Sequence, residues 1–111
     1  MAVIYEVQNK LDEALIKYNE SVKIKPDLKD AIFRMGIIYG KQKKYEDAAK
    51  QYEEVLKIDT NDADSHLLLG QIYESKNFKA DAVSHYKEVL RINPNHEQAE
   101  VIKIRVKQLE E

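Results

Sequence analysis

The sequence predicts an all-α protein built from stacked antiparallel helix pairs, and three observations lead to this prediction. The pair Gly36 and Tyr39 returns 34 residues later as Gly70 and Tyr73, and a fixed period of this length indicates stacked supersecondary units. Charged residues make up 34% of the chain, whereas it holds only 3 glycines and 2 prolines, a composition that favours long solvated helices. Apolar residues recur at three- and four-residue spacing, which is the period of a helix with one buried face.

The first two expected helices are separated by a turn. Residues 1–8 are expected to form the last turns of one helix, and Asn9 is expected to form the turn, because asparagine tolerates positive φ. The second helix is expected over Leu11–Ile24. Pro26 ends it, since proline cannot continue a helix and restricts the residue before it.

The central pair of helices has equally clear limits. Asp27 is expected to cap a helix over Leu28–Gly40 by accepting a free backbone N–H. A turn at residues 41–44 then leads to the helix Tyr45–Ile58. The lysines of this turn are expected to be a solvated feature near the carboxyl end of the preceding helix rather than a binding patch.

Three more helices complete an expected total of seven, with no strand. The turn-forming residues 59–61 precede a helix over Asp62–Ser75, and Asn77 is expected to repeat the turn role of Asn9. The next helix, Lys79–Ile92, ends at the breaker around residue 94. The last is expected over His96–Glu110.

Small residues indicate where the helices of a pair approach each other. Gly36 and Gly70 lie on the first helix of each pair, where a missing side chain permits close contact. Ala48 and Ala82 are expected to face them from the second helix, while the tyrosines fill the interface.

These offsets resemble the tetratricopeptide repeat, whose pattern is an aromatic residue, then Leu-Gly, Tyr, Ala, an aromatic residue and Pro. The central unit matches at Ile32, Met35, Gly36, Tyr39, Ala48 and Tyr52, and the next at His66, Leu69, Gly70, Tyr73, Ala82, Tyr86 and Pro94. A first unit that lacks most of its first helix matches at Ala2, Tyr5, Ala14, Tyr18 and Pro26. The departures are Ile32 and His66 in place of tryptophan, Thr60 in place of proline, and Phe78, one residue before the place that Tyr45 holds.

The resemblance implies a right-handed α-solenoid of about two and a half repeats that forms a single domain over residues 1–111. Residues 1–26 would be a truncated first repeat, 27–60 and 61–94 two full repeats, and 95–111 a capping helix. Because such arrays need a polar cap at each end, the helix Leu11–Ile24 is expected to expose apolar surface. The chain is therefore expected to be a fragment of a longer array, or to pair with a copy of itself.

Composition narrows the classes of function. Asp plus Glu number 20 against 18 Lys plus Arg, so no overall positive field favours nucleic acid. Cysteine is missing, which removes thiolate metal sites and cysteine nucleophiles, and no apolar run is long enough for membrane insertion. No signal peptide is evident, so a cytoplasmic location is expected. No phosphate loop or catalytic serine motif occurs, and we expect neither an enzyme nor a cofactor.

The residues Asp62, Asp64 and His66 resemble part of a metal site. Aspartates in the first turn of a helix are favoured by capping and by the helix dipole without any metal. We therefore expect no metal site, and we expect His66 to pack against the preceding helix.

In the family that the sequence resembles, the first helices of successive pairs line a concave groove that receives a peptide or a partner helix. Carried onto this chain, the groove residues are Val3, Glu6, Asp30, Phe33, Arg34, Ile37, Lys41, Asp64, Leu67, Gln71, Glu74, Gln98, Val101 and Arg105. The helical pattern supports this choice, because Phe33 and Ile37 stand four apart on a different face from the residues that pack. With Leu67 they are expected to form an exposed apolar strip, unless Phe33 and Leu67 pack against neighbouring helices.

The sequence thus predicts a non-enzymatic scaffold that binds an apolar or amphipathic protein segment. A carboxylate clamp is not expected, because Arg34 is the main cation of the groove. The alternative is a self-association module that forms homo-oligomers through the amino-terminal end or the groove.

Overall fold

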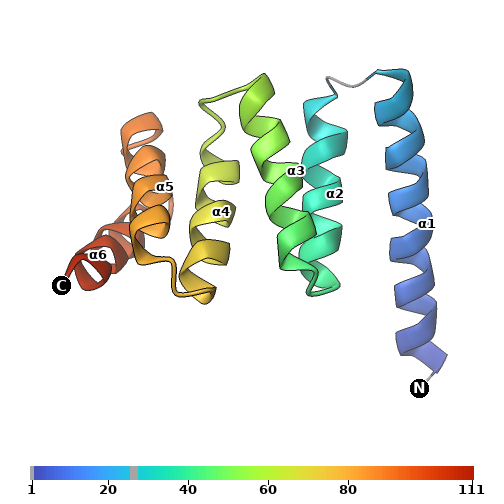
Figure 1. Cartoon of the computed structure of the whole chain (residues 1–111), viewed down its shortest axis with the longest axis horizontal. Coiled ribbons are helices and arrows are strands. Elements are labelled where there is room, and N and C mark those ends of the chain that lie inside the picture. The colour runs from blue at the N-terminus through green and yellow to red at the C-terminus, as the bar shows by residue number, and fades with distance from the viewer. Residues whose placement is uncertain (1, 26–27) are drawn as a thin grey trace. The chain divides into compact units, whose positions relative to one another are not determined.

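The computed structural model describes the backbone of residues 2–25 and 28–111, and the side chains of residues 10–25 and 28–111. The described chain contains helices and no strand (Figure 1). The helices are α1 (Ala2–Ile24), α2 (Lys29–Lys41), α3 (Tyr45–Ile58), α4 (Ala63–Ser75), α5 (Lys79–Ile92) and α6 (Ala99–Glu110). They fall into two compact units, an amino-terminal unit over Met1–Ile58 and a carboxy-terminal unit over Asp59–Glu111.

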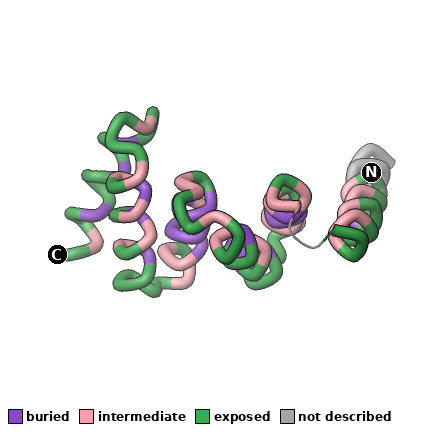
Figure 2. Tube along the Cα trace, turned by 90° about the horizontal axis from the view of Figure 1, so that it is seen from above, coloured by how far each residue is buried: buried purple, intermediate pink, exposed green. Residues whose placement is uncertain are grey.

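In the amino-terminal unit, α2 and α3 form an antiparallel pair and α1 packs against α2. Leu15 of α1 joins Met35 and Ile38 of α2 in one buried cluster. On α3, the side chains of Tyr52 and Val55 are buried as well. In Figure 2 buried segments alternate with intermediate and exposed ones along the helices.

The expected turn at Asn9 is wrong, because α1 is one continuous helix of 23 residues. Continuing the helix through Asn9 adds one backbone hydrogen bond for each residue that is fixed. The described residues therefore form six helices rather than the expected seven. The expected exposed apolar surface on the second half of α1 is confirmed, since Ile16 is 58% and Ile24 87% exposed.

In the carboxy-terminal unit, α4 and α5 form the second antiparallel pair, and α6 packs against α5 (Figure 1). Ala82, Tyr86 and Val89 of α5 are buried together with Ile102 and Val106 of α6. The core of the unit therefore lies between three helices, with α5 in contact with both others.

Two predicted helix starts can be compared with the structure. Asp62 caps α4, because its carboxylate accepts a hydrogen bond from the Ser65 N–H at 2.9 Å. The last helix begins at Ala99 instead of His96, because His96 is held in a turn. Its Nδ1 accepts the Gln98 N–H at 3.1 Å, and its carbonyl accepts the Ala99 N–H at 2.8 Å. The proposed cap Asp27 and the breaker Pro26 lie outside the described residues.

The two tight turns inside the helix pairs have the same backbone conformation. Asn77 adopts φ 65°, which confirms its predicted role, and Lys43 adopts φ 61° at the equivalent place 34 residues earlier. In each turn the residue that follows donates its N–H at 2.8 Å to the carbonyl of the repeat tyrosine, Tyr39 or Tyr73. This pattern satisfies carbonyls that a helix end leaves without partners.

The predicted close approach at Gly36 and Gly70 is confirmed. A Cβ atom at Gly36 would lie 2.6 Å from Cε1 of Tyr52, and one at Gly70 would lie 2.7 Å from Cε1 of Tyr86. The nearest group to a Cβ atom at each glycine would therefore be a tyrosine ring. The expected facing of the glycines by Ala48 and Ala82 stays a prediction. Burial disfavours the tyrosinate form and raises the pKa of Tyr52 to about 12.

We predict that Gly36→Leu lowers the free energy of unfolding by about 1–3 kcal/mol or more, because the new side chain overlaps a ring that is only 3% exposed. Chemical denaturation of the two variants Gly36→Leu and Gly40→Leu measures the effect. Gly40 lies in the same helix and has no atom within 4 Å of its added Cβ, so its variant is expected to unfold like the unaltered protein or later. Equal losses in the two variants would contradict the close-contact interpretation.

Candidate functional site

A hollow of about 420 Å³ lies beside α2 in the amino-terminal unit, and we call it the amino-terminal hollow. It is lined by Tyr18, Asp30, Phe33, Arg34, Ile37, Ile38 and Lys41. Five of these were predicted from the sequence as groove residues. They come together because residues three, four and seven apart lie on one face of a helix.

The amino-terminal hollow has an apolar wall and a charged rim. Phe33 is half-buried, with its ring tilted at 53° to that of Tyr52 and the centroids 5.6 Å apart. Asp30, Arg34 and Lys41 are exposed, and none of them forms a hydrogen bond or ion pair through its side chain with another described residue. These charges are therefore available to a bound molecule.

A second hollow of about 370 Å³, the carboxy-terminal hollow, lies between α4 and α6. It is lined by Leu67, Gln71, Glu74, Ser75, Tyr86, Gln98, Val101, Ile102 and Arg105. All the predicted groove residues of these two helices gather here except Asp64. The Asp64 carboxylate lies 3.6 Å from Nε2 of His96.

Glu74 is the polar centre of the carboxy-terminal hollow. Its carboxylate accepts a hydrogen bond from the Tyr86 hydroxyl at 2.7 Å, and its other oxygen lies 3.0 Å from Nε of Arg105. Burial raises the pKa of the Tyr86 hydroxyl, and the hydrogen bond to Glu74 raises it further. The three side chains therefore connect all three helices of the unit through one charge-compensated group.

The expected apolar strip is wrong at one of its residues. Leu67 is only 7% exposed and belongs to the core cluster with Ile102 and Val106. The exposed apolar residue of this hollow is instead Val101, which is 62% exposed. Most apolar residues that line the carboxy-terminal hollow therefore also belong to the core of the unit.

Sequence reasoning did not include several lining residues. Tyr18 and Tyr86 were assigned to the scaffold because they occupy repeat positions, yet both also reach the hollows. The repeat pattern assigns each tyrosine to the interface between two helices. A tyrosine at the edge of that interface can also line a neighbouring hollow, and this signal could have identified both residues. The predicted groove residues Val3 and Glu6 belong to α1, but their side chains lie outside the described residues.

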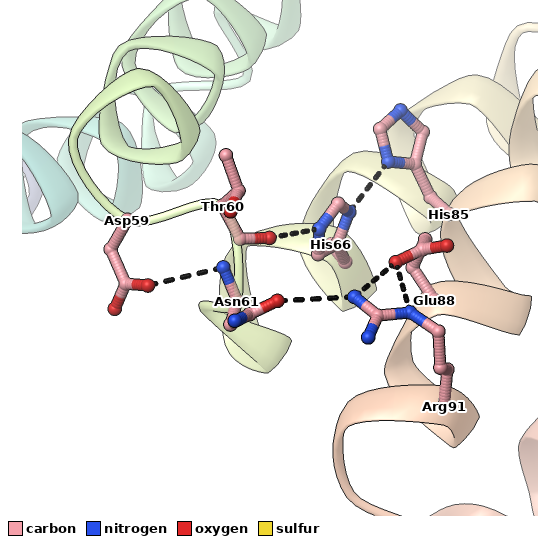
Figure 3. Close-up of polar contacts among 7 residues, drawn as sticks. All are labelled: Asp59, Thr60, Asn61, His66, His85, Glu88 and Arg91. Carbon is pink, nitrogen blue, oxygen red and sulfur yellow. Dashed lines mark hydrogen bonds and ion pairs between the residues drawn. The ribbon is translucent and has the colours of Figure 1, made fainter.

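A histidine pair, which the sequence did not predict, joins α4 to α5 (Figure 3). Nδ1 of His66 lies 3.0 Å from Nδ1 of His85, and Nε2 of His66 lies 3.0 Å from the carbonyl of Thr60. A carbonyl can only accept, so Nε2 of His66 donates to it. In the neutral pair, Nδ1 of His66 must then accept a hydrogen bond from the Nδ1–H of His85.

Further contacts surround the histidine pair. The ring of Tyr73 stacks on His85 with centroids 5.5 Å apart and an interplanar angle of 16°. Arg91 donates from Nη2 to Asn61 Oδ1 at 3.1 Å and forms an ion pair with Glu88 (Figure 3). This ion pair lowers the pKa of the Glu88 carboxyl, chiefly through the hydrogen bond from Arg91.

The structure separates the residues that resembled a metal site. His66 hydrogen-bonds to the turn before α4 and to the helix that follows, α5. Its expected packing against the preceding helix stays a prediction. Asp62 caps α4 and Asp64 faces His96. Among the described residues, no group of three His, Cys, Asp or Glu side chains is arranged to hold a metal ion.

We predict that, at mildly alkaline pH, His66 is the Nε2–H tautomer and His85 the Nδ1–H tautomer. Long-range ¹H–¹⁵N correlation spectra of the imidazole rings distinguish the two forms. His96, whose Nδ1 accepts the Gln98 N–H, serves as an internal reference for the Nε2–H form. Finding His85 as the Nε2–H tautomer would contradict the hydrogen-bond assignment.

None of the helices in the described part of the chain is both long enough and apolar enough to cross a membrane. The absence of direct nucleic-acid contact and the cytoplasmic location expected from the sequence both stay predictions.

Together, the paired helices and the hollows beside their first helices define a helical-repeat scaffold. Family models for the TPR repeat and the tetratricopeptide repeat match residues 38–77 and 63–96. The chain belongs to the tetratricopeptide repeat family. It therefore has the fold of a protein–protein interaction scaffold.

Solved structures support the same fold. The Arabidopsis OM64 TPR domain matches with a TM-score of 0.80 at 17% identity, over 96% of this chain and 88% of that one. The crystal structure of MamA matches with a TM-score of 0.75 at 19% identity, over 80% of this chain and 52% of that one, so this chain spans about half of the MamA chain. No curated protein sequence matches this chain. The predicted class, an all-α solenoid of antiparallel helix pairs, is confirmed.

Proposed function

We propose that this protein is a non-enzymatic scaffold whose two hollows bind an amphipathic peptide or helix of a protein partner. One observation supports this proposal above the others: the same repeat positions line a hollow in each unit. Phe33, Ile37 and Lys41 line the first, and Leu67, Gln71 and Ser75, each 34 residues further along, line the second. A surface that recurs with the repeat is the surface through which such scaffolds bind extended partners.

The composition of the hollows favours an amphipathic partner. Phe33, Ile37 and Val101 offer apolar contacts, whereas Arg34 and Lys41 offer positive charges at the rim. A segment with apolar anchors on one face and polar groups beside them matches both features.

Two hydroxyl groups of the carboxy-terminal hollow are not arranged for nucleophilic catalysis. The Ser75 hydroxyl donates to the Ile72 carbonyl at 2.7 Å, where no base can accept its proton. The Tyr86 hydroxyl has a raised pKa and therefore stays protonated and a weak nucleophile. Both observations support binding rather than chemistry.

A second candidate function is self-association, and the exposed apolar residues of α1 favour it. Ile16 and Ile24 are 58% and 87% exposed on a helix whose other face is buried against α2. Exposed apolar residues on a helix surface are typical of contact surfaces. This candidate shares the amino-terminal unit with the first but uses a different face of α1.

We predict that Val101→Glu reduces partner capture tenfold or more, because it places a charge in the carboxy-terminal hollow beside Glu74. Ile104→Glu is the matched control. Ile104 lies on the same helix and is 59% exposed against 62% for Val101, but it does not line the hollow. Affinity capture with each immobilised variant, quantified for every protein that the unaltered chain retains, measures the effect. Equal capture by the two variants would overturn the assignment of this hollow.

A further inference from the structure

The outer face of α1 carries a stripe of exposed residues that the binding hollows do not use. Glu13, Ile16 and Glu20 follow one another at intervals of three and four residues, and all are exposed. They lie on the opposite side of α1 from the buried Leu15 and half-buried Tyr18. Neither Glu13 nor Glu20 forms an ion pair with a described residue.

The amino-terminal hollow has the same arrangement with opposite charge. Arg34, Ile37 and Lys41 also follow one another at intervals of three and four residues. In both sets an isoleucine stands between two like charges seven residues apart, a separation of about 10 Å along a helix. The acidic stripe of α1 and the basic rim of the hollow are therefore complementary in charge and in spacing.

We infer that the acidic stripe of α1 in one copy of this chain docks into the amino-terminal hollow of a second copy. The inference deepens the self-association candidate described above by naming both of its surfaces. When the two helices lie antiparallel, Glu20 stands opposite Arg34 while Glu13 stands opposite Lys41. Ile16 then lies on the same side of the contact as Ile37, and two exposed or half-exposed apolar side chains are covered together.

The neighbouring charges agree with this alignment. Lys23, three residues beyond Glu20, falls level with Asp30 at the far end of the hollow and forms a third opposite pair. Lys17, between Glu13 and Glu20, has no opposite partner in the contact. It lies about a quarter turn around the helix from Ile16, at the flank of the stripe.

The contact joins two different surfaces. Unless two copies dock reciprocally, one copy of the pair retains a free hollow and the other a free stripe, so the assembly extends into a ring or a filament. Complementary charges also orient the encounter and make it sensitive to salt. The association is therefore expected to weaken as ionic strength rises.

Two double variants of the full chain test the alignment with nearly identical compositions. Glu20→Arg with Arg34→Glu exchanges the charges of one predicted pair, so the opposite charges remain in contact. Glu20→Arg with Lys41→Glu has the same net charge, but it places Arg next to Arg34 and Glu next to Glu13. The single variant Glu20→Arg is the third member of the set.

Sedimentation velocity over a range of protein concentrations measures the association. We expect the unaltered chain to associate, Glu20→Arg to weaken association on the order of tenfold, and the exchange with Arg34 to restore it. The variant with Lys41→Glu is expected to associate more weakly than Glu20→Arg alone. Helical content and thermal unfolding of each variant show whether it is folded, since all three positions are exposed.

Two results would overturn the inference. One is an unaltered chain that stays monomeric at every concentration, and the other is equal association of the two double variants. Neither result touches the proposed binding function, because Val101 and its hollow belong to the carboxy-terminal unit.

Discussion

The geometry of both units depends on the contact between a tyrosine ring and a glycine of the facing helix. Cε1 of Tyr52 and of Tyr86 would lie within 2.7 Å of a Cβ atom at Gly36 or Gly70, so any larger residue there would force the helices apart. Each ring can cover its glycine only at one height along the helix. The contact therefore fixes both the separation and the register of the pair, and the positive-φ turns at Lys43 and Asn77 close the pair at that register.

The same contact explains why the first helix of each pair has a free face. In α2, Met35 and Gly36 lie on the side of the helix that packs against its neighbours. Phe33 and Ile37 lie on another side and line the amino-terminal hollow. In α4 the equivalent positions also line a hollow, but α6 covers Leu67 and converts it into a core residue. One repeat pattern therefore produces two related surfaces, and the neighbouring helix decides how apolar each surface is.

Most of the fold could be predicted from the sequence because the repeat offsets and the helix breakers specify the same boundaries. The prediction failed at Asn9, where the repeat pattern assigned a turn and the helix continues instead. The groove residues were predicted from the family resemblance, with support from helical periodicity at Phe33 and Ile37. The burial of Leu67 depends on how α6 packs, which no repeat offset specifies. The pair His66 and His85 is brought together by the antiparallel register of α4 and α5, and a single helix gives no sign of it.

A double-mutant cycle between Gly36 and Tyr52 tests the central claim most directly. Gly36→Ala is measured by chemical denaturation in the unaltered chain and again in a Tyr52→Leu background, in which the ring that meets the new Cβ is removed. The account predicts that the alanine is destabilising when Tyr52 is present and neutral or stabilising when it is replaced, because alanine favours a helix over glycine by up to about 1 kcal/mol. An alanine that costs the same free energy in both backgrounds would contradict it.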